Sequence, residues 1–183
     1  MLQITIPGGE RYDEQKEEFV VIKPCLLQLE HSLVSVSKWE SKWHKAFLDK
    51  KEKSNEELID YIRCMCITQN VDPEVFRFIP SSELAKINEY ISNPMTATWF
   101  SEDQKKSGGR GMKEVVTSEL IYYWMIALNI PFECQKWHLN RLMTLINVCS
   151  IKNTPPKKMS SHDILKRNAS LNAARRARLH TKG

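Results

Sequence analysis

No run of this sequence approaches the roughly 18 uninterrupted apolar residues that a membrane-spanning helix requires. The N-terminal residues, Met1-Leu2-Gln3-Ile4, also lack the basic flank and the apolar core of a secretory signal. Apolar residues make up 42% of the chain and charged residues 27%, which is typical of a globular protein. We therefore expect a cytoplasmic protein that has no membrane partner.

Motifs that bind metals or carry out catalysis are missing as well. No two of the five histidines are four residues apart, as they would be in a helical metal site, and no Gly-x-Ser-x-Gly turn is present for a nucleophile. The five cysteines are an odd set in apolar surroundings, which favours buried reduced thiols over a disulfide framework. The sequence thus predicts no catalytic residue, no metal site and no cofactor, and we do not expect an enzyme.

Large apolar and aromatic residues are concentrated between Glu114 and Ser150. The segment 121–128 is apolar at almost every position, which predicts a helix covered on nearly every side. From Phe132 to Cys149 the apolar positions follow one helical stripe, which predicts an amphipathic helix. With Asn129-Ile130-Pro131 between them, these two helices are expected to pack antiparallel at the centre of the domain.

The first 30 residues carry β signals instead. Leu2 to Ile6 alternates apolar and polar residues, Phe19 to Ile22 is rich in β-branched residues, and Pro7-Gly8-Gly9 predicts a turn between them. We expect a hairpin of these two segments, or a three-stranded sheet that includes Cys25 to Leu29. The predicted fold class is therefore mainly α with a small N-terminal β element, which allows an α+β description.

The remaining signals give helix starts and boundaries. Apolar positions from Leu33 to Phe47 step by three and four, and Ser54-Asn55-Glu56-Glu57 matches a capping box that opens a second helix. We expect three parts: an N-terminal β element at 1–30 packed on the body, a helical body at 31–152, and a basic, helix-prone extension at 153–183.

The net charge of the chain changes sign at the end of the helical body. Residues 151–183 contain nine basic residues and one acidic residue, a net charge of +8, whereas residues 1–150 contain 18 basic and 21 acidic residues, a net charge of −3. Arg175, Arg176 and Arg178 predict a contact for nucleic acid or an acidic partner. The extension has no aromatic residue for base stacking, so a solvated helical end is the favoured alternative.

Two aromatic pairs are candidates for binding a partner. Trp39 and Trp43 lie one helical turn apart, as do Trp137 and Arg141, whose spacing allows a cation–π contact. Buried packing for the tryptophan pair, and ordinary packing on a helix surface for the second pair, are the alternatives. As partner-binding residues we select Trp39, Trp43, Trp137 and Arg141, with the three arginines of the extension as a second contact.

Several stretches of the chain resemble a known family when they are taken together. They are Leu29-Glu30-His31-Ser32-Leu33, the segment from Ser37 to Trp43, Thr68-Gln69-Asn70-Val71-Asp72-Pro73, and Trp137-His138-Leu139-Asn140-Arg141-Leu142. Across most of residues 2 to 170 the chain is similar to the tail assembly chaperones encoded by siphophages and related prophages. The likeness lies in the whole string and contains no catalytic motif.

The resemblance implies a non-catalytic protein of the host cell cytoplasm that binds the tape-measure protein. Such a chaperone keeps that long chain soluble during viral tail assembly and is absent from the finished virion. Self-association is compatible with this role. A virion structural component of the tail or connector is the main alternative, followed by a nucleic-acid-binding protein that acts through the basic extension.

Overall fold

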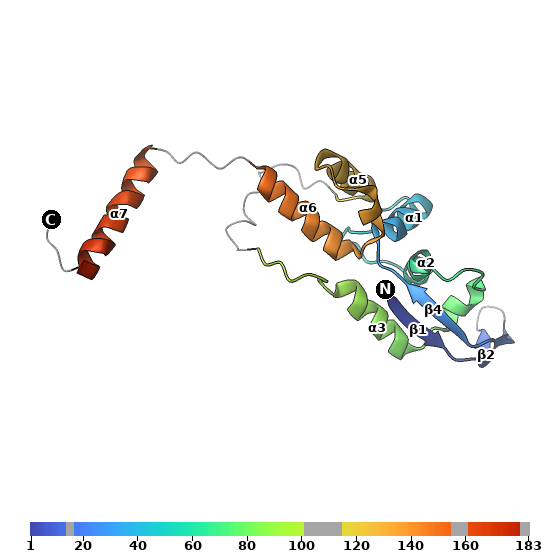
Figure 1. The fold of residues 1–183 in the computed structure, drawn as a ribbon. Coiled ribbons are helices and arrows are strands. Elements are labelled where there is room, and N and C mark those ends of the chain that lie inside the picture. Colours follow the sequence, from blue (N-terminus) through green and yellow to red (C-terminus); the bar gives the residue numbers. More distant parts are fainter. Residues whose placement is uncertain (14–16, 101–114, 155–160, 180–183) are drawn as a thin grey trace. The chain divides into compact units, whose positions relative to one another are not determined.

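The computed structural model describes residues 1–13, 17–100, 115–154 and 161–179. The described part is mainly helical with a small antiparallel β element near the N-terminus, which confirms the predicted fold class (Figure 1). The chain divides into two compact units, Met1–Ser150 and Ile151–Gly183. Each unit is described separately below.

The β element pairs differently from the predicted hairpin. Strand β1 (Leu2–Ile6) pairs with β4 (Cys25–Leu29), and β2 (Gly9–Asp13) pairs with β3 (Glu18–Ile22), both antiparallel. Pairing of Leu2–Ile6 with Phe19–Ile22 is therefore wrong. Because Ile6 faces Cys25 and Gly9 faces Ile22, both ladders share one register and form one long two-stranded ribbon.

Two prolines explain why this ribbon is interrupted. In the shared register Pro7 lies opposite Pro24, and proline has no N–H group to donate to a ladder. Gly8 is required beside them, since a Cβ atom at this position would lie 2.5 Å from Cδ of Pro24. The interruption separates an inner part, β1 with β4, from an outer hairpin, β2 with β3.

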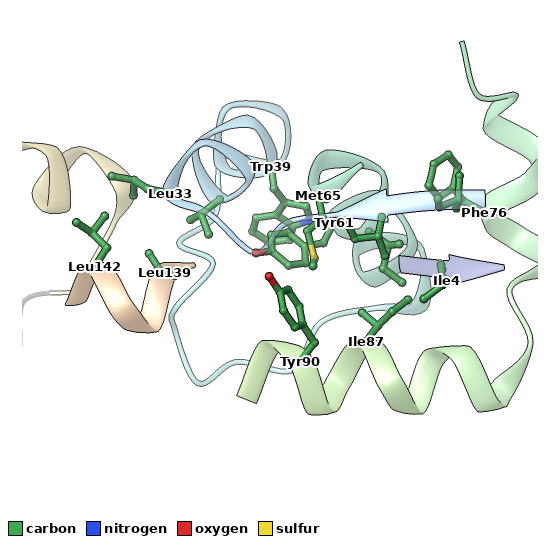
Figure 2. Close-up of a cluster of buried hydrophobic side chains, with 14 of the residues drawn as sticks. Ile4, Leu33, Trp39, Tyr61, Met65, Phe76, Ile87, Tyr90, Leu139 and Leu142 are labelled. Carbon is green, nitrogen blue, oxygen red and sulfur yellow. The ribbon is translucent and has the colours of Figure 1, made fainter. Parts of the chain in front are cut away.

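Helices α1 (Leu33–Trp43) and α2 (Asn55–Met65) pack against each other. The Ser54 Oγ accepts a hydrogen bond from the Glu57 N–H at 3.3 Å, and the Ser54 N–H donates to Glu57 Oε2 at 2.7 Å, which confirms the capping box. The Trp39 indole N–H donates to the Glu57 carbonyl at 2.8 Å and ties the two helices together inside the core. Tyr61 and Met65 of α2 belong to the same buried cluster (Figure 2).

The other elements surround this pair. They are η1 (Pro73–Phe78), which contacts α2, α3 (Ser81–Ser92), which contacts β1, α5 (Ser118–Ala127), η2 (Phe132–Lys136) and α6 (Leu139–Asn153). Helix α7 (Ser161–Leu179) belongs to the second unit. Residues Ile4 of β1 and Ile87 of α3 extend the core cluster to the sheet side (Figure 2).

The centre of the first unit is α1, which contacts α2, α5 and η2, and not the expected pair of α5 and α6. The last turn of α5 and the second half of α6 line a shared hollow of about 300 Å³, whereas an antiparallel pair would place the end of α5 beside the start of α6. Helix α5 is also not covered on every side, because Tyr123 and Ile126 are 63% and 60% exposed. One stripe, Ile121 and Met125, supplies its buried contact.

Glu40 is a buried carboxylate near the end of α1. Its Oε1 accepts a hydrogen bond from the Phe47 N–H at 2.8 Å, and its Oε2 accepts one from the Ser118 N–H at 2.7 Å. The second bond satisfies a free N–H group at the start of α5. One side chain therefore joins α1, the loop that follows it and the first turn of α5.

We expect Glu40→Gln to lower the free energy of unfolding by about 1–3 kcal/mol, because the new amide NH₂ would face a backbone donor. Urea titration measures the difference. Glu56→Gln, at an exposed position of α2, is the control and should stay within about 0.5 kcal/mol of the parent protein. Equal stability of the two variants would show that the two hydrogen bonds to Glu40 are dispensable.

Candidate polypeptide-binding groove

An open hollow of about 670 Å³ lies where the outer hairpin, the end of α1, helix α2 and η1 meet. We call it the Trp43 groove. Each of the four elements contributes one large apolar or aromatic side chain to its lining, namely Tyr12, Trp43, Ile59 and Phe78. Its charged lining residues are Lys42, Glu56, Asp60, Arg63 and Arg77.

Local structure explains how these side chains reach the groove. Trp43 is the last residue of α1, and its indole N–H donates to Asp60 Oδ2 at 2.9 Å, which fixes the ring against α2. Ile59 and Arg63 are four residues apart on α2 and therefore share one face. Tyr12 lies opposite Phe19 in the hairpin, with the two rings packed edge to face at 5.3 Å.

The charges of the groove are arranged with the carboxylate inside and the cations outside. Lys42 Nζ lies 2.5 Å and Arg63 Nη1 3.7 Å from Asp60 Oδ1. The side chain of Asp60 is 10% exposed, compared with 55% for Lys42 and 43% for Arg63. Burial would raise the pKa of Asp60, but the hydrogen bonds from Lys42 and Trp43 lower it, so the carboxylate stays ionised.

A second hollow of about 450 Å³ shares Lys42, Asp60 and Arg63 with the Trp43 groove. Its lining extends to Lys38 of α1, Cys64 of α2 and Phe76 of η1. Because Lys38, Lys42 and Arg63 are exposed whereas Asp60 is buried, cations dominate the surface along both hollows. Glu56 is the exposed carboxylate at the first hollow.

The structure separates the two predicted tryptophans. Trp43 lines the groove, whereas Trp39 is 1% exposed and belongs to the core. Their rings stack at a centroid distance of 6.2 Å. The prediction that Trp39 contacts a partner is wrong, because its ring and its N–H group are both used inside the domain.

The other predicted contact residues lie outside the groove. The Arg141 guanidinium is 4.3 Å from the centre of the Trp137 ring, so the expected cation–π pair is present at the start of α6. Arg175, Arg176 and Arg178 are exposed on α7 in the second unit. Sequence reasoning placed Trp43 alone among the groove residues and missed Tyr12, Ile59 and Phe78.

A buried pair of histidines was also missed. The rings of His31 and His138 are 5.0 Å apart, and both side chains are buried. His31 Nδ1 is hydrogen-bonded to the hydroxyl of Tyr61, and His138 Nε2 is 3.0 Å from the Tyr90 carbonyl oxygen. Burial, and secondarily His138, lowers the pKa of His31 to about 4. Burial also lowers the pKa of His138.

Among the described residues, no group of three or more His, Cys, Asp or Glu side chains is placed to hold a metal ion. The five cysteines are free thiols. No helix in the described ranges is long and apolar enough to cross a bilayer. Comparisons of this chain with family models, curated proteins and solved structures find no match.

The histidine pair predicts a pH dependence of stability. His31 is neutral in the folded state down to about pH 4, whereas an unfolded histidine gains its proton near 6.5. The contribution of neutral His31 to the free energy of unfolding is therefore fully present above pH 6.5. It falls by up to about 3 kcal/mol as the pH is lowered toward 4.

Urea titrations at pH 7 and pH 5 measure this loss. His31→Gln should reduce the difference between the two pH values, because the side chain that titrates is removed. His44→Gln, at an exposed position, is the matched control. Identical pH dependence in the parent and in His31→Gln would rule out His31 as the titrating group.

Proposed function

We propose that this chain binds a segment of another polypeptide in the Trp43 groove and acts, without catalysis, as a phage tail assembly chaperone. The observation that carries this proposal is an open groove in which four elements supply an apolar or aromatic side chain and two exposed cations surround a buried carboxylate. The partner is the tape-measure protein, which the resemblance of the sequence implies.

The shape and chemistry of the groove suit a polypeptide. The hollow has a volume of about 670 Å³ and is open to solvent, so a segment of chain can enter it from the surface. Apolar side chains at helical spacing on a partner would pack against Trp43 and Ile59, in the manner of a helix bound in a groove. Acidic side chains on the same partner would reach the exposed heads of Lys42 and Arg63.

The outer hairpin enlarges the apolar surface beside the groove. Phe19 and Val21 share one face of β3 with Tyr12 of β2, and both are 72% exposed. A two-stranded hairpin is marginally stable on its own. A bound segment that makes apolar contacts with the hairpin would therefore stabilise it. The stabilised hairpin would in turn hold the segment more tightly.

Co-expression with the tape-measure protein, followed by pull-down, tests the function. We expect the parent chain to retain the tape-measure protein in the soluble fraction and to bind it. The double variant Tyr12→Ala/Arg63→Glu should lower the captured amount at least about tenfold, because it removes an apolar contact and reverses an exposed charge.

The matched control is Trp99→Ala, which removes a 93% exposed tryptophan that does not line the groove. Capture at the parental level is expected for this variant. If the tape-measure protein stays insoluble and unbound with the parent chain, the chaperone role fails. If capture is unaffected by the double variant, another surface holds the partner. Purified particles that contain the chain in stoichiometric amount would favour the virion component instead.

A further inference from the structure

We propose that α7 is a preformed basic helix that binds duplex nucleic acid, independently of the Trp43 groove. The helix extends over 19 residues, Ser161–Leu179, and every side chain described on it is exposed. Five basic residues lie on it: Lys166, Arg167, Arg175, Arg176 and Arg178. The observation that carries the inference is this density of exposed cations on an unburied helix.

The cations are distributed around the helix. Consecutive helical residues differ by about 100° in direction, so Lys166 and Arg167 diverge, as do Arg175 and Arg176. Arg178 lies within about 20° of Arg167 and about 60° from Arg175, so the five cations point in four directions. A flat acidic surface of a protein would contact one side of such a helix, whereas a groove between two phosphate backbones presents anions on both sides.

The helix is also slender enough for the major groove. Ala169, Ala173, Ala174 and Ala177 keep much of its surface free of long side chains. An α-helix with its side chains is about 10–12 Å across, and the major groove of B-form DNA is about 12 Å wide. Arginines near its C-terminal end can reach phosphates on either side of such a groove.

Other polyanionic partners fit less well. An interfacial membrane helix needs one continuous apolar face, but Asn168 and Asn172 lie between Ile164, Leu171 and Leu179 on the same side of α7. Single-stranded nucleic acid is bound by stacking on aromatic rings, and residues 151–183 contain no aromatic residue. The duplex is therefore the partner that the composition and geometry favour.

The cation excess is confined to the second unit. Residues 151–183 carry a net charge of +8, and residues 1–150 carry −3. Phosphates are therefore attracted to the unit that contains α7 and are not attracted to the first unit as a whole. Binding should depend on α7 residues and be insensitive to lysines of the first unit.

Fluorescence anisotropy with a labelled 30-base-pair DNA duplex tests this inference on the full chain. The logarithm of the binding constant should fall with the logarithm of salt concentration with a slope of about −0.9 for each phosphate contacted, or roughly −4.5 for five contacts. Arg175→Gln/Arg176→Gln/Arg178→Gln should make the slope shallower by about 2.7 and weaken binding at least about tenfold near 100 mM salt. Circular dichroism confirms that the helix content is retained.

The matched control is Lys23→Gln/Lys50→Gln/Lys51→Gln, which removes the same charge from exposed positions of the first unit. Its affinity should stay within about twofold of the parent. The inference is overturned if the parent chain does not bind the duplex, if the control loses as much affinity as the α7 variant, or if poly-glutamate competes as well as the duplex at equal charge. Capture of the tape-measure protein by the α7 variant is measured in a separate assay, so either proposal can fail without the other.

Discussion

The first unit depends on one buried carboxylate, that of Glu40. A carboxylate loses its hydration on burial, and this cost is offset here by two backbone N–H groups, those of Phe47 and Ser118. The same bonds fix the end of α1 relative to α5 and to the loop after α1. Lys42 and Trp43 lie within this last turn, so the geometry of the groove rests in part on the hydrogen bonds that Glu40 accepts.

Helix α1 joins core and groove through two tryptophans with different surroundings. The indole of Trp39 donates to the Glu57 carbonyl inside the core, and that of Trp43 donates to the Asp60 carboxylate at the groove. Both acceptors belong to α2, so each ring is held in one orientation. A fixed aromatic ring loses little conformational entropy when a partner packs on it, which favours Trp43 as a contact residue.

Sequence reasoning succeeded where the signals were local. The capping box at Ser54 and the helix that begins at Leu33 depend on residues a few positions apart, and both are present, although α1 ends at Trp43 and does not reach Phe47 as predicted. The strand Gly9–Asp13 was missed because its sequence, GERYD, does not alternate between apolar and polar residues. This segment is extended because it pairs with β3. His31 and His138 are distant in the sequence, so no local pattern indicates that they pair. Tyr12 and Phe78 of the groove come from separate elements, so no local pattern indicates that they lie near each other.

The two units offer surfaces of different chemistry, the Trp43 groove in the first unit and the basic helix α7 in the second. Contacts in the Trp43 groove rest on apolar area, which salt at moderate concentration does not weaken, with a smaller charged contribution at its rim. The nucleic-acid contacts proposed for α7 would rest on the release of counterions and would weaken steeply with salt. If both proposals hold, a partner in the groove is expected to stay bound at a salt concentration that removes nucleic acid from α7. Salt thus separates the two interactions without altering either unit, and the net charge of −3 on residues 1–150 keeps the overall attraction for phosphate on the second unit.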